Sequence, residues 1–189
     1  QLSCNDIRLL ATRVQCTRGI IVARAAGAQE LRGVFTAEHD LETRESALRI
    51  ELTEAIGGGL TGQLRLRGEH WTLKLSAKGL SAALVKTLAG YDGGAVLTDA
   101  QGMLSLAMDV AGDANGIRDA TGRVEFEALE FNGIHVAEAL SGVVEFAMKN
   151  PVADWFVEID ATVTGGIVYF EPGLEIRGIK PGFTVEAST

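Results

Sequence analysis

Two cysteines have the clearest capacity for covalent chemistry in this 189-residue sequence. Cys4 and Cys16 lie in the segment C-N-D-I-R-L-L-A-T-R-V-Q-C. If a hairpin turns near Leu10, the two thiols face each other on neighbouring strands, where a disulfide would stabilise the fold by ~3 kcal/mol. Such a bond predicts an oxidising compartment, and the alternative is two unpaired buried thiols in a cytosolic protein. Two cysteines alone cannot form a metal site.

The other residues that often bind metals are scattered. His39, His70 and His135 are isolated in the sequence, and no paired Cys/His spacing or calcium-loop pattern occurs. Acidic residues such as Glu145 and Glu158 occupy alternate positions of predicted strands, which indicates a solvated face rather than a catalytic pair. The sequence therefore predicts no metal site.

No sequence motif for a phosphate or a nucleophile is complete. The glycine-rich segment 57–62 lacks the Lys-Ser/Thr ending of a phosphate loop and leads into a strand, and no G-x-S-x-G elbow occurs. We therefore expect no cofactor and no enzymatic activity, although a triad assembled from distant segments would escape this search.

The two tryptophans suggest sugar stacking as an alternative. Trp71 and Trp155 share strand parity with the aliphatic residues Leu73, Leu75 and Val157, however, and aromatic residues make up only 6% of the chain. A sugar site typically needs several exposed rings among polar partners. We expect both rings to line a core or a groove, with a carbohydrate-binding jelly roll as the less favoured reading.

The elements that would position these residues are two similar hairpins. One reads G-Q-L-R-L-R-G-E-H-W-T-L-K-L-S-A from Gly62 to Ala77, and the other reads G-V-V-E-F-A-M-K-N-P-V-A-D-W-F-V-E-I-D-A from Gly142 to Ala161. Alternation places apolar side chains on one face and Arg65, Lys74 and Glu145 on the other. The predicted groove residues on the apolar face are Leu64, Leu66, Trp71, Leu73, Leu75, Leu104, Leu106, Met108, Val124, Phe126, Val144, Phe146, Trp155, Val157 and Ile159.

Glycines recur at regular intervals in these repeats. Gly62, Gly102, Gly122 and Gly142 are separated by 40, 20 and 20 residues, which indicates a sheet that grows by adding hairpins and curls at its glycines. We predict an all-β fold: an elongated, curled antiparallel sheet that forms an open trough, in a single domain over 1–189. One short helix near 81–89, with Ser81 as its cap, would close an end or edge of the sheet.

Charge and hydropathy exclude some classes of function. The net charge is −8 and the sequence pI is near 4.9, which disfavours nucleic acid as a partner. No apolar run approaches the ~18 to 20 residues that span a bilayer. The sequence begins at Gln1 without a leader, so we expect a segment of a longer chain.

The repeated hairpins, the segment L-S-A-A-L-V-K-T-L-A-G from Leu80 to Gly90, and G-G-I-V-Y-F-E-P from Gly165 to Pro172 resemble the AsmA-like, TamB-like and YdbH-like proteins of the bacterial envelope. The resemblance lies in the repeat pattern and covers most of the chain. It implies a trough with an apolar inside, a periplasmic location, an inner-membrane anchor in the parent chain, and passive passage of phospholipid between membranes.

The apolar face supports this expectation on physical grounds. A sheet with one apolar face must cover that face, and the sequence offers only one convincing helix to do so. Acyl chains would fill the gap at ~0.8 kcal/mol for each buried methylene. The alternative is a closed sandwich that serves as an assembly or adhesion module.

Overall fold

A computed structural model of the chain describes residues 1–23, 30–52, 58–82, 98–132, 135–150, 156–170, 174–177 and 183–188. Nearly all of these residues are in strands. The strands are β1 (Leu2–Leu9), β2 (Arg13–Ala23), β3 (Leu31–Asp40), β4 (Glu45–Leu52), β5 (Gly59–Arg67), β6 (His70–Ser81), β7 (Thr98–Asp113), β8 (Gly116–Asn132), β9 (His135–Lys149), β10 (Phe156–Phe170), β11 (Leu174–Arg177) and β12 (Phe183–Ser188).

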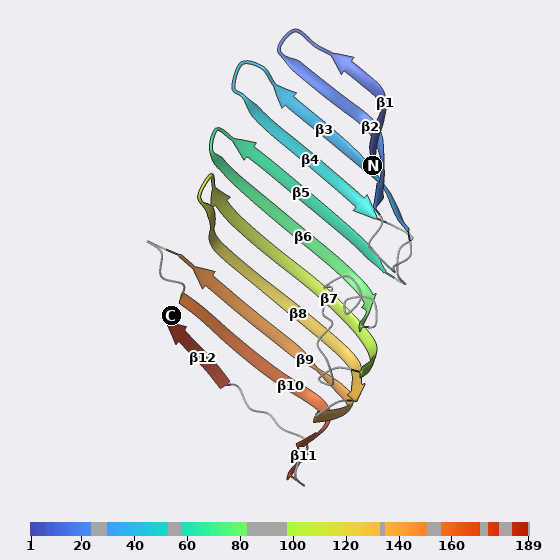
Figure 1. Ribbon diagram of the computed structural model, residues 1–189, viewed down its shortest axis with the longest axis vertical. Coiled ribbons are helices and arrows are strands. Elements are labelled where there is room, and N and C mark those ends of the chain that lie inside the picture. The colour runs from blue at the N-terminus through green and yellow to red at the C-terminus, as the bar shows by residue number, and fades with distance from the viewer. Residues whose placement is uncertain are drawn as a thin grey trace.

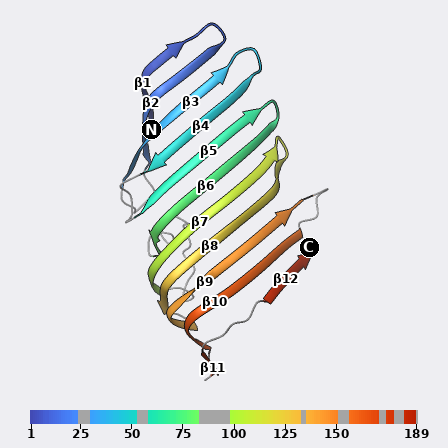
Figure 2. The same cartoon turned by 180° about the vertical axis from the view of Figure 1, so that it is seen from behind.

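The strands form one open antiparallel sheet in sequence order (Figure 1). Each strand from β1 to β10 pairs with the next, and the outer edge of β10 is shared by β12 and β11. The view from behind shows the same single layer (Figure 2). The all-β prediction is confirmed. The helix expected over 81–89 falls mostly outside the described residues, and Ser81, its predicted cap, is the last residue of β6.

Cross-strand pairing aligns apolar side chains into rows that run across the sheet. Directly paired residues point to the same face, so the register defines each row. The central row consists of Ile7, Cys16, Ala37, Leu48, Leu64, Leu73, Val110, Ala120, Met148 and Val157. We call the face that carries this row and its parallel neighbours the apolar face.

Glycines in the next row make room for large side chains. Gly122 on β8 is paired with Phe146 on β9, and a β-carbon at Gly122 would lie 2.6 Å from Cε1 of that ring. The same arrangement places Phe126 over Gly142, at 2.7 Å between Cζ and the position of the missing β-carbon. These rings therefore lie flat against the backbone of the neighbouring strand. Glycine is needed at these two positions because an aromatic ring approaches the backbone closely, and not because the strand bends there.

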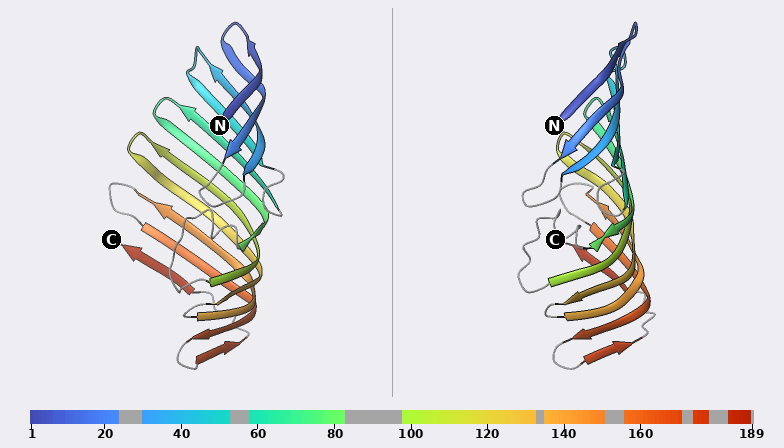
Figure 3. Two further views of the ribbon diagram at one scale, coloured as in Figure 1. Left: turned by 45° about the vertical axis from the view of Figure 1, so that its right-hand side comes forward. Right: turned by 90° about the vertical axis from the view of Figure 1, so that its right-hand side faces the viewer.

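A line of bulges bends the second half of the sheet. We call it the crease, and its residues all have positive φ: Gly79 at 64°, Gly102 at 105°, Ala128 at 49°, Ala139 at 49° and Gly166 at 102°. They lie at or beside register shifts in five consecutive strands, β6 to β10. Because a bulge bends its strand, the aligned bulges account for the curl at the ends of these strands (Figure 3).

The crease is held by close packing and by side-chain hydroxyls. A β-carbon at Gly102 would lie 2.5 Å from the main-chain oxygen of Ala128, so the bulges of β7 and β8 fit against each other. The N–H of Gly79 donates to Ser105 Oγ at 3.3 Å, and the N–H of Ala128 donates to Ser141 Oγ at 3.1 Å. These serines satisfy donors that the bulges remove from the regular ladder.

Candidate functional site

The predicted groove residues share one face of the sheet, with the exception of Trp155, which lies outside the described residues. The register places them in neighbouring rows. The central row contains Leu64, Leu73 and Val157, and the next row, which also contains Gly122, contains Leu75, Met108, Phe146 and Ile159. The row after it contains Leu106, Val124 and Val144, and the one beyond contains Leu104 and Phe126. Leu66 and Trp71 are paired beside the β5–β6 turn. Their role in lipid binding stays a prediction.

The apolar face is larger than the sequence prediction. It continues through β1 to β4 with Ile7, Val14, Phe35, Leu48 and Ile50, each registered with the next strand. The signal was present, because these residues alternate with polar ones in the same way. The prediction omitted them because the recurring hairpin motif begins only at Gly62.

A hollow of about 380 Å³ lies on the apolar face over the first five strands. Its apolar lining includes Ile7, Val14, Leu48, Leu64 and Leu66. Ile7 and Leu66 are exposed, whereas Leu48 and Leu64 are half-buried. The face is therefore accessible at this end of the sheet and offers almost only carbon to a ligand.

Polar groups on this face are bonded to one another at the hairpin ends of the strands. His39 Nδ1 and Ser46 Oγ lie 2.8 Å apart in the row that joins Val14 to Leu66. The indole N–H of Trp71 donates to the main-chain oxygen of Asp113 at 3.1 Å. These groups are satisfied within the protein, so they make little demand for a polar ligand.

Packing of Trp71 disfavours the sugar-stacking alternative. A β-carbon at Gly112 would lie 2.6 Å from Cε2 of the indole, so one side of the ring is against the backbone of β7. The side chain is half-buried. A ring that is covered in this way and has its N–H bonded to the protein is typical of a wall residue.

Asp113 organises the turn between β7 and β8. It is the one buried charged residue among those that the structure describes, at 7% exposed. The N–H of Asn115 donates to its Oδ1 at 2.8 Å, and Arg118 Nη2 lies 2.5 Å from Oδ2. The Asn115 amide, together with the charges of Arg118 and His70, holds the pKa of Asp113 below its ordinary value.

The opposite face carries ion pairs rather than a reactive cluster. A hollow of about 700 Å³ lies there, and its lining includes Lys74 and Asp109, 3.3 Å apart, and Arg123 and Glu145, 2.6 Å apart. Hydrogen bonds from Arg123 to Glu125 and Glu145 hold the pKa of Arg123 above its ordinary value. This hollow is larger, and beside these ion pairs its lining also includes the carboxylates of Glu158 and Asp160. No group of three potential metal ligands occurs in the described ranges.

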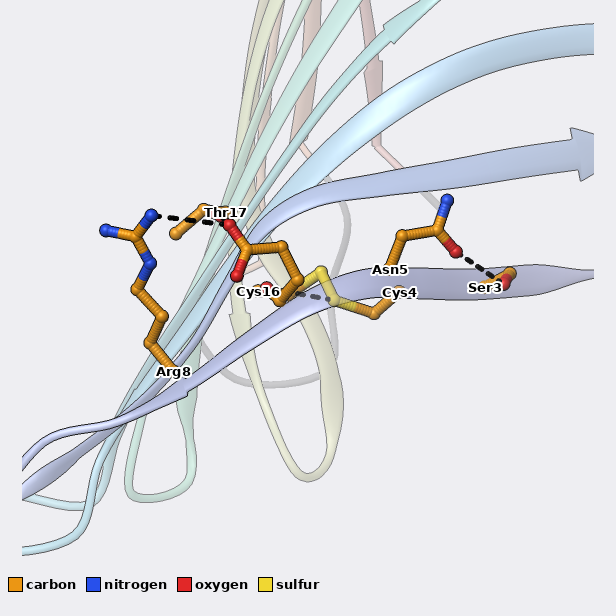
Figure 4. The surroundings of a disulfide bond; sticks show 7 residues. Ser3, Cys4, Asn5, Arg8, Cys16 and Thr17 are labelled. Carbon is orange, nitrogen blue, oxygen red and sulfur yellow. Dashed lines mark hydrogen bonds and ion pairs between the residues drawn. A yellow bond between two sulfur atoms is a disulfide. The ribbon is translucent and has the colours of Figure 1, made fainter.

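The predicted disulfide is present between β1 and β2 (Figure 4). The S–S distance is 2.00 Å and the Cα atoms are 6.1 Å apart. Cys4 is registered with Gly19 and Cys16 with Ile7, so the bond runs diagonally across the pair of strands. Two register shifts lie between Cys4 and Ile7, one on each side of Asp6. Both cysteines line the hollow on the apolar face.

Comparisons with protein families, characterised proteins and solved structures find no match to this chain. Within the described parts of the chain, no helix has the length and apolar character needed to cross a membrane.

Proposed function

We propose that the apolar face binds the acyl chains of phospholipids and conducts them passively across the strands, as a segment of a periplasmic bridge protein of the bacterial envelope. The observation that carries the proposal is the continuity of the apolar rows through every strand from β1 to β10. At a strand spacing of ~4.8 Å, these rows extend for about 45 Å. A chain that moved along them would pass from one apolar contact to the next.

The composition of the face suits a ligand made of hydrocarbon. Each methylene that leaves water for this surface contributes ~0.8 kcal/mol, without any hydrogen bond that must be broken before the next step. Low specificity and low barriers to movement follow from such contacts. In the proposed function the charged head group stays in solvent, no cofactor takes part, and the parent chain supplies an inner-membrane anchor.

The open architecture also favours a bound ligand over a closed sandwich. The described strands form one sheet, not two facing sheets. Leu64, Leu73 and Leu75 in its centre are half-buried instead of fully enclosed. A lipid would complete the burial that the sheet begins. The disulfide supports an oxidising location such as the periplasm.

Lipid that copurifies with the protein tests the proposal. We expect native mass spectrometry and lipid extraction of freshly expressed protein to find bound phospholipid. Leu73→Glu, at the centre of the apolar face, should lower bound lipid roughly tenfold, equivalent to about 1.4 kcal/mol, because a carboxylate would face the acyl chains.

Thr72→Glu is the matched control, because Thr72 is the adjacent residue of β6 and is exposed on the opposite face. It should leave bound lipid unchanged. Circular dichroism checks that both variants are folded. Protein that is free of lipid, or equal loss in the two variants, would contradict the proposal.

A further inference from the structure

The two ends of the strands carry different rows of the apolar face. The turns that join β1 to β2, β3 to β4, β5 to β6 and β7 to β8 lie along one side of the sheet (Figure 1). We call the row beside these turns the rim row. Its members, paired in register from β1 to β8, are Leu9, Val14, His39, Ser46, Leu66, Trp71, Gly112 and Ile117. At the other end, Leu80, Leu104 and Phe126 form the row beside the crease.

Polar side chains on the apolar face are confined to the rim row. His39, Ser46 and Trp71 are its polar members. In the paired rows from the central row to the crease, no described side chain has a nitrogen or oxygen atom. Along each strand, the face therefore changes from partly polar at the turns to wholly apolar at the crease.

Solvent access changes in the same direction. In the rim row, Leu9 is 78% exposed, and Leu66 and Ile117 are each 41% exposed. In the row beside the crease, Leu80 is only 6% exposed. The rim row is thus the open side of the apolar face, and the row beside the crease is the covered side.

The apolar face is wide enough along the strands for an acyl chain. Leu60 precedes Leu66 by six residues on β5, which corresponds to ~20 Å at ~3.3 Å per residue. One leaflet of a membrane supplies half of the ~30 Å hydrocarbon core, about 15 Å. An acyl chain laid along the strands from the rim row therefore stays on the apolar face over its whole length.

Each hairpin carries a cationic side chain at the end with the rim row. These side chains are all exposed: Arg13 at the start of β2, Arg44 before β4, Arg67 at the end of β5, Arg118 near the start of β8, and Lys149 at the end of β9. Arg44 and Lys149 form no ion pair with another described residue. Arginine and lysine are the side chains that bind phosphate most strongly.

Carboxylates share this end of the sheet with the cations. Arg67 lies 2.9 Å from Glu45, and Glu42 and Glu69 are in the turns. The cations are therefore separate points of contact and do not form a positive surface. Because exposed ion pairs contribute little stability, a phosphate group can compete with these carboxylates.

We propose that a phospholipid on the apolar face lies along the strands, with its phosphate at the cations of the hairpin ends and its acyl chains directed toward the crease. This inference rests on the proposed function and adds an orientation to it. Cations of successive hairpins are two strands apart, or ~10 Å. A lipid that moves across the strands would pass its phosphate from one hairpin to the next, while its head group stays in solvent.

Photoreactive phospholipids test the orientation with the full chain. One phosphatidylethanolamine probe carries a benzophenone on the head group, and the other carries it at the end of an acyl chain. Mass spectrometry of crosslinked peptides should place the head-group probe at 9–14, 39–46, 66–71 and 112–118. The acyl-chain probe should label the row beside the crease, at Leu80, Leu104 and Phe126.

The two probes separate failure of the orientation from failure of the proposed function. Labelling of the same residues by both probes, or labelling beside the crease by the head-group probe, would overturn the orientation and leave lipid binding intact. Absence of labelling by either probe would overturn both the orientation and the proposed function.

A charge-matched pair of variants tests the phosphate contact. Arg44→Gln/Lys149→Gln should lower bound phospholipid about threefold at low salt, because two exposed contacts to phosphate are lost. Arg65→Gln/Lys78→Gln is the control, since it removes two exposed cations, one on the opposite face and one near the crease. It should leave bound lipid unchanged, and circular dichroism checks that both variants are folded. Unchanged binding by the first variant, or equal loss in both, would overturn the phosphate contact.

Discussion

The first five strands and the next five carry the same apolar rows but cover them differently. Leu2, Ile7, Leu9 and Leu66, on the apolar face of β1 and β5, are exposed, whereas most of the buried apolar residues of this face, such as Ala77, Val110, Ala120 and Ala161, lie in β6 to β10. Buried Phe35 in β3 and exposed Ile117 in β8 are exceptions. The ladders from β3 to β6 are regular, whereas those from β1 to β3 and those from β6 to β10 all contain bulges.

Side-chain size and curvature explain the difference. The crease bends the strands β6 to β10 (Figure 3). Small residues lie between large ones there, so neighbouring side chains cover one another. In β1 to β5 the outer edge of β1 pairs with no described strand. The apolar face is thus more accessible to solvent toward β1. The comparison teaches that the same alternation of apolar and polar residues can leave the apolar face exposed in one half of a sheet and covered in the other.

The largest effect is expected from removal of the disulfide that links β1 to β2, in the more exposed half of the sheet. Replacement of Cys4 and Cys16 by alanine should lower the free energy of unfolding by ~3 kcal/mol, because the bond, at a sequence separation of 12, removes the closure entropy of this loop from the unfolded chain. Hydrogen exchange should accelerate in β1 and β2 and stay unchanged in β7 to β9. Uniform acceleration along the chain would contradict a separate role for the two halves.

The next largest effect is expected from a change in side-chain packing in β6 to β10. Gly122→Ala should destabilise the protein by about 1–3 kcal/mol in denaturant unfolding, because the new methyl group overlaps the ring of Phe146. Gly59→Ala is the matched control, since a β-carbon there meets no atom within 4 Å. Equal stability of the two variants would show that the ring does not rest on the backbone.

A smaller effect tests the crease. Ala128 has φ of 49°, a conformation that is unfavourable for residues with a β-carbon, so Ala128→Gly should stabilise the protein by about 0.5–1 kcal/mol in thermal unfolding. Ala107→Gly, at an exposed position of β7 without positive φ, should destabilise it by a similar amount. The same sign for both variants would exclude the bulge at Ala128.

The smallest effect is the pH dependence contributed by the β7–β8 turn. The pKa of Asp113 is lowered in the folded state by the Asn115 amide, Arg118 and His70. The stabilisation from this carboxylate is therefore complete above its unfolded value near 3.8 and is lost as the pH falls through the folded value.

Thermal unfolding between pH 7 and pH 2 measures this contribution. Asp113→Asn should unfold with a shallower decline of Tm in acid than the unmodified protein. Asp119→Asn, an exposed position of β8, should keep the original slope. An unchanged acid slope in Asp113→Asn would show that the lowered pKa of this carboxylate does not contribute to stability.

Alternation made the single apolar face predictable from the sequence, because period two assigns a face without any knowledge of the neighbouring strand. The disulfide was predictable for a related reason, since a hairpin near Leu10 brings its cysteines onto adjacent strands. Register was less accessible. When the two repeated hairpins are aligned at Gly62 and Gly142, Leu66 corresponds to Phe146 and both have the same strand parity. Leu66 nevertheless pairs with Trp71, whereas Phe146 pairs with Ile159.

The crease could not be predicted, because two of its five residues are alanines in left-handed conformation. Nothing in the local sequence distinguishes Ala128 or Ala139 from a regular strand residue. Their conformation is imposed by the facing bulges at Gly102 and Gly166, where a β-carbon would approach the oxygens of Ala128 and Ala139 to 2.5 and 2.8 Å. This is a property of the assembled sheet, which a glycine repeat alone does not reveal.

Photocrosslinking to phospholipid tests the central claim most directly. A benzophenone amino acid placed at Leu48, Leu73 or Val144 samples the apolar face in both halves, and one placed at Ala47, Thr72 or Glu145 samples the adjacent residue on the other face. The account predicts crosslinks to vesicle or copurified phospholipid at the first three positions and none at the second three. Equal labelling of both faces, or no labelling at all, would contradict it.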